Sequence, residues 1–309
     1  MSSYYGPDES APEISLERAF VAGDVVTGVG FGAQVALYMH CVLYLWKRRN
    51  INRSAIFLLA YITTLLSVEV VFVVVQAKTV QMIYIDNRNY PGGPWAFFLA
   101  TQNAPVNVIF YATLFVLTFL SDILVLWRCW VIWAADGLTG VAYLVIAFPC
   151  IMLLGSFAMG VLWTLESSQP GLSLYSERPM AYGTAYYAIS LSVNVVISIL
   201  IIARLLIYRR RLRTGVPGAR ASHYLSIATI FVESAALYSV FAILFLITYA
   251  TDEPTNQIWL SVASAAQEIA GYLIIYRLAD GRAWQSDTMR ISSVVAAGMQ
   301  FSLGTGDDM

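Results

Sequence analysis

The chain has 309 residues, of which 59% are hydrophobic and 12% are charged, and its formal net charge is −1. Soluble domains have roughly 45–50% apolar and about 25% charged residues, so this chain has too few polar side chains to cover a soluble globule. The composition predicts an integral membrane protein, and the near-zero net charge gives no support to a nucleic-acid partner.

The predicted elements are a tail, seven apolar segments and a second tail. Residues 1–19 form an acidic amino-terminal tail, and residues 279–309 form the carboxyl-terminal tail. Each apolar segment is long enough to cross roughly 30 Å of hydrocarbon as a helix. In chain order they are 20–46, 54–76, 104–130, 141–163, 183–208, 224–249 and 256–278. The third segment is already apolar from Trp95, so Pro105 marks either a kink or the true start.

Lysine and arginine gather on one side of these segments. The richest stretches are KRRNINR at 47–53 and RRRLRTGVPGAR at 209–220. Basic loops stay on the cytoplasmic side of a membrane, so the amino terminus is expected outside and the carboxyl terminus in the cytoplasm. The expected fold is therefore all-α: a polytopic seven-transmembrane-helix bundle in contact with the lipid bilayer, most simply in the plasma membrane. The loop at Arg209–Arg213 is a candidate contact for a cytoplasmic signalling protein.

Ionisable residues inside the apolar segments are the first candidate functional residues, because buried charge in a membrane is costly and tends to face the bundle interior. Counting 1.5 Å per residue places three acids in the cytoplasmic half, above the three arginines Arg128, Arg204 and Arg277. Residues six apart, such as Asp122 and Arg128, lie on different helical faces, so partners must come from other helices. We predict an interhelical polar cluster that acts as a switch, formed by Asp122, Arg128, Arg204, Glu233 and Glu268. In the alternative, the arginines reach lipid phosphates, and the acids are protonated or hydrogen-bonded to Ser, Asn and backbone groups.

A second group of candidates lies in the outer half of the bundle. Glu69 falls there, and the outer end of the third segment adds polar side chains. With aromatic residues of other segments, they predict a pocket for a small lipophilic ligand. Its candidate residues are Glu69, Gln102, Asn107, Trp163, Tyr187 and Trp259. The alternative for each aromatic residue is the ordinary belt at the membrane interface.

Several chemistries lack the residues that they need. A retinal pigment requires a lysine in the last segment, but the lysines of this chain are Lys47 and Lys78. A zinc hydrolase requires several ligands, and the histidines are His40 and His223. No catalytic, phosphate-binding or dinucleotide motif stands in a suitable context. The sequence therefore predicts no enzyme, no cofactor and no metal.

Three stretches carry a resemblance to a known family. They are LSDILVLWRCWVIW at 120–133, SHYLSIATIFVESAALYSVF at 222–241 and AAQEIAGYLIIYRLADGRAW at 265–284. With the seven segments, they resemble an uncharacterised family of seven-span integral membrane proteins of mushroom-forming (basidiomycete) fungi, loosely described as receptor-like. The resemblance covers most of the chain and implies no particular activity. Similarity to G-protein-coupled receptors is topological, because Trp127 rather than an acid precedes Arg128.

These features leave three functions open. The first is a receptor-like sensor whose ligand shifts the helices and opens the inner cluster. The second is a transporter or channel for a small lipophilic metabolite or protons, since such proteins also use carboxylates at mid-depth. The third is an accessory membrane protein of a biosynthetic pathway. A pocket open only to the outside would favour the sensor, and a tunnel joining both sides would favour transport.

Overall fold

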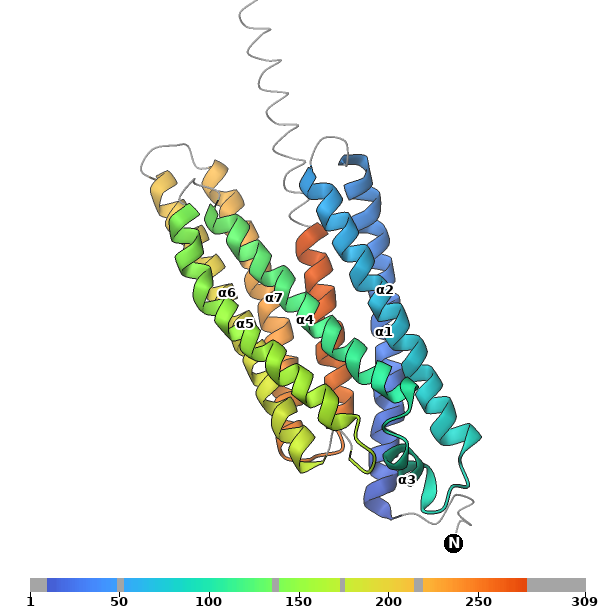
Figure 1. Cartoon of the computed structure of the whole chain (residues 1–309). Coiled ribbons are helices and arrows are strands. Elements are labelled where there is room, and N and C mark those ends of the chain that lie inside the picture. The colour runs from blue at the N-terminus through green and yellow to red at the C-terminus, as the bar shows by residue number, and fades with distance from the viewer. Residues whose placement is uncertain (1–9, 49–52, 135–138, 173–175, 214–218, 277–309) are drawn as a thin grey trace, which may run out of the picture.

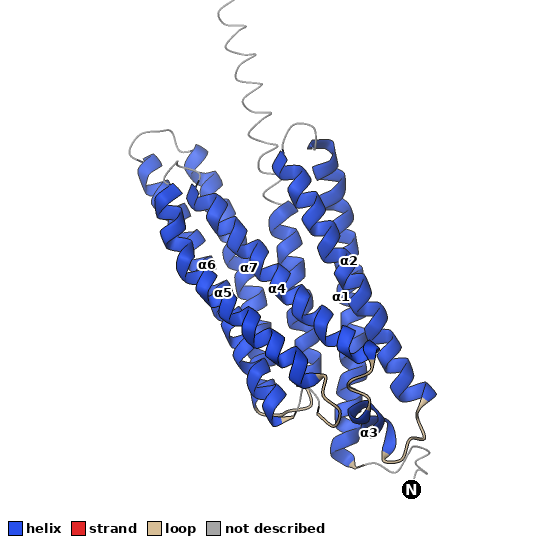
Figure 2. Cartoon of the chain, in the orientation of Figure 1, coloured by secondary structure: helices blue, strands red, loops and turns tan. Residues whose placement is uncertain are grey.

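The computed structural model describes residues 10–48, 53–134, 139–172, 176–213 and 219–276. Every regular element among these residues is helical (Figure 2). The elements are α1 Ala11–Arg48, α2 Arg53–Gln81, the π-helical turn η1 Met82–Asp86, α3 Gly93–Ala100, α4 Pro105–Ala134, α5 Thr139–Ser167, α6 Glu177–Arg213, α7 Ala219–Ala250 and an unlabelled last helix, Asn256–Tyr276.

The long helices form one bundle (Figure 1). Helix α4 crosses between the α1–α2 pair and the group of α5, α6 and α7, and it contacts α2, α5 and α6. It is also the most enclosed of the long apolar helices, because 50% of its most apolar stretch is buried, against 28% for α5. A central α4 explains why the polar side chains discussed below project from it or toward it.

Among the described residues, six helices are long and apolar enough to cross a membrane. They are Ala11–Lys47, Ala55–Asp86, Pro105–Ala134, Gly140–Ser167, Glu177–Ile207 and Asn256–Tyr276. Large apolar side chains also stand exposed on the bundle surface, for example Leu144 at 79% and Ile151 at 69% on α5. Such a surface is suited to lipid rather than water, so the chain is a multi-pass helical membrane protein.

The predicted segments overlap these helices, although α1 begins earlier and α2 ends later than predicted, and three further points concern α7, α4 and α6. The described apolar part of α7 is the shorter helix Ala236–Ala250, so the seventh crossing stays a prediction. Helix α4 begins at Pro105, because proline suits the first turn, where its missing N–H leaves no hydrogen bond unmade. The predicted loop at Arg209–Arg213 is wrong as a loop, because α6 continues as a helix through Arg213.

Helix α3 covers the end of the bundle where α1 begins. The turn before it contains Gly92 at φ 89°, a left-handed conformation that favours glycine. Phe98 of α3 lies 5.8 Å from Phe20 of α1, measured between ring centroids. The amide of Gly171, after α5, donates to the carbonyl of Leu99 at 3.0 Å. This end of the bundle, called here the amino-terminal end, is therefore closed over by packed chain.

Candidate functional site

Asp122 of α4 is the centre of a hydrogen-bonded group that joins three helices. Its side chain is fully buried. It accepts hydrogen bonds from Ser190 Oγ at 2.7 Å and Asn194 Nδ2 at 2.6 Å, both on α6, and from Gln267 Nε2 at 3.0 Å on the last helix. Ser190 and Asn194 are four residues apart, so they share the helical face turned toward α4.

The partners of Asp122 differ in kind from the predicted ones. The prediction placed an arginine of another helix beside Asp122, whereas the structure places one hydroxyl and two amide donors there. This arrangement corresponds to the alternative in which the acid is hydrogen-bonded to uncharged side chains. Three donors are a physically sufficient replacement for a base, because hydrogen bonds to a carboxylate are stronger than those between neutral groups.

Arg128 lies inside the bundle rather than at a lipid surface. Its side chain is 2% exposed, and Nη2 donates to the carbonyl of Gly271 on the last helix at 2.8 Å. Nε and Nη1 have no acceptor among the described residues. The titratable side chains whose charge would act on it are Tyr61 and Cys41. Arg128 is thus held in place by one backbone carbonyl.

Glu69 of α2 and Glu268 of the last helix are brought together at the middle of the bundle. Their carboxyl groups lie close enough to interact, and the Gln34 amide of α1 also faces Glu69. The exposed fractions are 3% for Glu69 and 2% for Glu268. Two carboxylates in contact away from water repel each other, so the pair is stable when it holds at least one proton. The prediction had placed these acids in opposite halves of the bundle.

The two remaining members of the predicted inner cluster lie elsewhere. Glu233 of α7 is exposed on the surface, so it does not join the buried group around Asp122. The guanidinium of Arg204 on α6 lies over the ring of Trp133, 4.9 Å from its centroid. A rise of 1.5 Å per residue puts Arg204 about 15 Å along α6 from Asn194. The cluster prediction therefore needs correction for both residues.

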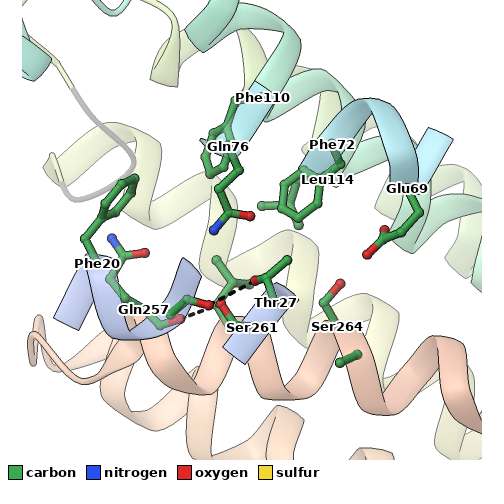
Figure 3. Close-up of a pocket in the computed structure, with 13 residues that line it drawn as sticks. Phe20, Thr27, Glu69, Phe72, Gln76, Phe110, Leu114, Gln257, Ser261 and Ser264 are labelled. Carbon is green, nitrogen blue, oxygen red and sulfur yellow. Dashed lines mark hydrogen bonds between the residues drawn. The ribbon is translucent and has the colours of Figure 1, made fainter. Parts of the chain in front are cut away.

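Three cavities lie in succession along the last helix. The first, called the Glu69 cavity, has a volume of about 460 Å³ and is bounded by α1, α2, α4 and the last helix (Figure 3). A middle cavity of about 350 Å³ follows and shares Leu114, Leu260 and Ser264 with it. The third, called the Arg128 cavity, has about 570 Å³ and shares Tyr238 and Gln267 with the middle one.

The Glu69 cavity combines aromatic walls with a few polar groups. Glu69 and Gln76 point into it from α2, and Gln257 points into it from the last helix (Figure 3). Its apolar lining comes from Phe20, Phe72, Phe110, Leu114, Leu260 and Ala265. An aromatic pocket with a small number of polar groups is typical of a site for a small organic ligand.

Of the six residues predicted to form the outer pocket, Glu69 lines this cavity and two others hold the backbone beside α4. Gln102 donates to the carbonyl of Phe98 at 2.9 Å and accepts from the Tyr111 hydroxyl at 2.7 Å. Asn107 donates to the carbonyl of Thr101 at 2.8 Å. These amides therefore stabilise the turn between α3 and α4 instead of facing the cavity.

The three predicted aromatic residues pack against other rings. Trp163 stacks on Tyr186 with centroids 6.1 Å apart, and Tyr187 contacts Trp163 edge-on at 5.7 Å. Tyr187 also lines the middle cavity. Trp259 stacks on Phe241 at 6.4 Å. Trp163 and Tyr187 thus belong to a buried aromatic core on the amino-terminal side rather than to the Glu69 cavity.

Sequence reasoning missed the uncharged members of both groups. Ser190, Asn194 and Gln267 were not predicted, because the members of the inner cluster were chosen by their charge. A usable signal was present, since Ser190 and Asn194 are polar residues at i,i+4 in a mainly apolar segment, and Gln267 adjoins Glu268. In a membrane such amides and hydroxyls are the ordinary partners between helices.

No protein-family model matches the chain, and no curated protein matches it either. No group of three or more His, Cys, Asp or Glu side chains suited to a metal ion occurs among the described residues. The function is therefore argued from the helices, the hydrogen bonds and the cavities.

Proposed function

We propose that this chain is a seven-span receptor-like sensor in which the last helix carries a signal from the Glu69 cavity to Asp122. The observation that carries the proposal is the position of this helix. Its first turns supply Gln257, Leu260 and Ser264 to the Glu69 cavity. Farther along, it supplies Gln267 to Asp122 and the Gly271 carbonyl to Arg128. One rigid element thus contacts both the pocket and the inner polar group.

The proposed orientation places the amino terminus outside and the carboxyl terminus in the cytoplasm. Helices α1 and α6 end, and α2 and α7 begin, at the end of the bundle opposite α3 (Figure 1), and the sequence around these helix ends is basic at 47–53 and 209–220. Basic connections favour the cytoplasmic side, which would turn the Glu69 cavity outward and the Arg128 cavity inward. We also propose that the protein lies in the plasma membrane and that it is related to the basidiomycete family.

The ligand proposed for the Glu69 cavity is a small lipophilic molecule with a hydrogen-bond donor. The lining of this cavity, mostly apolar and aromatic with a few polar groups, is the kind usual for ligand pockets. The aromatic walls would contact its apolar body. The carboxyl group of Glu69 and the amides of Gln76 and Gln257 would bind its polar end.

The switch proposed is the hydrogen bond from Gln267 to Asp122. Its length is 3.0 Å, so a shift of the last helix by about 1 Å takes it beyond hydrogen-bonding distance. A hydrogen bond between membrane helices contributes about 0.6–1.7 kcal/mol, which corresponds to about a 3- to 20-fold change between two conformations. Ligand binding that favours the shifted helix by this amount would change the population of the active state.

The test measures signalling and transport on the same preparations. Wild-type protein, Asp122→Asn and Gln267→Leu would be assayed in nanodiscs for nucleotide exchange on heterotrimeric G proteins, with Ser192→Ala as control. Ser192 is exposed and donates to the Ala188 carbonyl of its own helix. We expect the two cluster variants to raise basal exchange about 3- to 20-fold and the control to leave it unchanged. Equal exchange in all four proteins would contradict the proposal.

Proton transfer is a second candidate, and it has its own supporting observation. Glu69 lines the first cavity, Glu268 lines the third, and the two carboxyl groups face each other between them. Such a pair can pass a proton from one cavity to the other. In proteoliposomes with a pH gradient, this function predicts a proton flux that Glu69→Gln abolishes and Ser192→Ala preserves. Wild-type flux without nucleotide exchange would replace the sensor proposal with this one.

A further inference from the structure

Arg128 carries a buried positive charge, and the described residues supply no counter-ion for it. The ion pair found among them is Lys78 with Asp86 at 3.7 Å, far from this site in the fold. One of the guanidinium nitrogens, Nη2, donates to the Gly271 carbonyl, while Nε and Nη1 have no acceptor in the part of the chain that the structure describes. A buried charge without a partner costs several kcal/mol, so this arrangement calls for an anion.

The neighbours of Arg128 do not provide that anion. The Tyr61 hydroxyl donates a hydrogen bond to the carbonyl of Leu120, and the Cys41 thiol donates to the carbonyl of Tyr272 at 3.6 Å. A side chain that donates its own proton is neutral, so neither residue is a phenolate or a thiolate. The carboxylate of Asp122 is already held by three other donors. Glu268 lines the same cavity as Arg128, but no ion pair joins the two among the described residues, so the charge of Arg128 has no direct partner there.

We propose that the Arg128 cavity binds a short-chain monocarboxylate, with its carboxylate on the guanidinium of Arg128. The guanidinium fork matches the two oxygens of a carboxylate and can donate to both. This site is separate from the Glu69 cavity, and it does not depend on whether the chain signals or transports.

The lining of the cavity defines the rest of the ligand. Ser121 Oγ is buried without a partner and faces the same space, so it can donate to a carboxylate oxygen. The apolar lining consists of Leu65, Leu124, Val125, Ala270 and Ile274. The Arg128 cavity has the most room of the three cavities, but that room is small, so a short acid suits it. Arg128 is the one basic residue in the described lining, so a dianion such as phosphate or sulfate would bring a second charge with no cation to meet it.

The bundle end nearest Arg128 favours the approach of anions. Arg128 lies in the half of α4 toward Ala134, the end of the bundle at which α1 and α6 also end (Figure 1), and the sequence around those helix ends is basic at 47–53 and 209–220. Clustered positive charge raises the local concentration of anions and the rate at which they arrive. In the proposed orientation, the monocarboxylate would come from the cytoplasm.

The experiment compares butyrate with butyramide, a neutral molecule of nearly the same shape. Full-length protein in nanodiscs would be titrated with each, following heat of binding and melting temperature. We expect butyrate to bind at least about 10-fold more tightly than butyramide and to raise the melting temperature. Arg128→Met should abolish butyrate binding, and Arg204→Met should preserve it, because Arg204 lies on Trp133 outside this cavity. Ala270→Leu, which fills the cavity and keeps the arginine, should also abolish it.

Each other outcome overturns the proposal. Equal binding of butyrate and butyramide, or butyrate binding that survives Arg128→Met, would show that the charge does not select the ligand. A response to chloride with none to butyrate would indicate an inorganic anion instead. Arg128→Met should melt at or above the wild-type temperature without ligand, because it removes an unpaired buried charge. A large fall in its melting temperature, together with no effect of butyrate on the wild type, would leave Arg128 a purely structural role.

Discussion

Three glycines on α1 allow a sharp test of how this helix packs on the last helix. Gly28, Gly30 and Gly32 alternate in the sequence GVGFG at 28–32. A Cβ atom at Gly30 would lie 2.7 Å from the Cβ of Ala265 on the last helix, whereas one at Gly28 or Gly32 would meet nothing within 4 Å. Ordinary carbon contacts are about 3.5–4.0 Å, so Gly30→Ala must push the two helices apart by about 1 Å.

The magnitude follows from two opposing effects. Overpacking of this kind costs about 1–3 kcal/mol. Replacing glycine by alanine inside a helix gains about 0.5–1 kcal/mol, and this gain applies at all three positions. Gly28→Ala and Gly32→Ala should therefore stabilise the protein slightly, and Gly30→Ala should fall about 1–3 kcal/mol below them.

The assay is thermal unfolding of the purified protein in detergent, followed by near-ultraviolet circular dichroism. At about 2–4 °C per kcal/mol, the melting temperature of Gly30→Ala should lie about 2–12 °C below those of the other two variants. Ala265 also lines the Glu69 cavity, so the same substitution should alter ligand binding there. If Gly30→Ala has the same melting temperature as Gly28→Ala and Gly32→Ala, then α1 and the last helix do not make this close contact.

Two further predictions concern the Asp122 group and the turn after α7. Ser190→Ala removes a hydrogen-bond donor to Asp122 and should lower stability by about 0.6–1.7 kcal/mol in the same assay. The control Ser192→Ala should change stability little, and equal losses in the two variants would contradict the role of Ser190. Burial and the nearby Glu253 carboxylate raise the pKa of Asp252, so the fold favours the neutral form of this side chain. The resulting stabilisation is fully present below about pH 4 and is lost as the pH rises through the raised pKa. Asp252→Asn is neutral at every pH, and asparagine tolerates the φ of 54° at this position. The variant should therefore melt at a higher temperature than wild type at pH 7 and at the same temperature below about pH 4. A higher melting temperature at both pH values would rule out this electrostatic cause.

Helix positions were predictable from the sequence, and helix ends were less so. Long apolar runs locate the membrane helices because a segment in lipid must satisfy its own backbone hydrogen bonds, and an α-helix does so. Helix α1 nevertheless begins at Ala11, before the apolar run. Its start has a local signal, since the amide and hydroxyl of Ser10 both donate to Glu13, the S-x-x-E pattern of a capped helix. Hydropathy does not detect such a signal, because it comes from polar residues.

The placement of Glu69 shows why an error at a helix end affects the site. The sequence predicted that its helix ends near residue 76, which puts Glu69 in the outer half. The structure continues α2 to Gln81 and η1 to Asp86, so Glu69 moves to mid-depth and meets Glu268. The contact between these two acids also depends on which helices are neighbours, and that information is tertiary. Depth counted from apolar run lengths alone could not reveal it.

The buried polar groups are of two kinds: those around Asp122 hold helices together, and those beside the Arg128 cavity are free to bind a ligand. Each donor to Asp122 is placed for that carboxylate, whereas Arg128 and Glu268 keep atoms without partners beside a cavity. Buried polar groups are nearly always paired, so unpaired ones next to open space mark where an occupant would release free energy. Gln267 and Gly271 lie four residues apart, on one face of the last helix. An anion that fixes Arg128 against Gly271 would therefore also fix Gln267 against Asp122, which makes occupancy of the Arg128 cavity oppose the helix shift proposed for signalling.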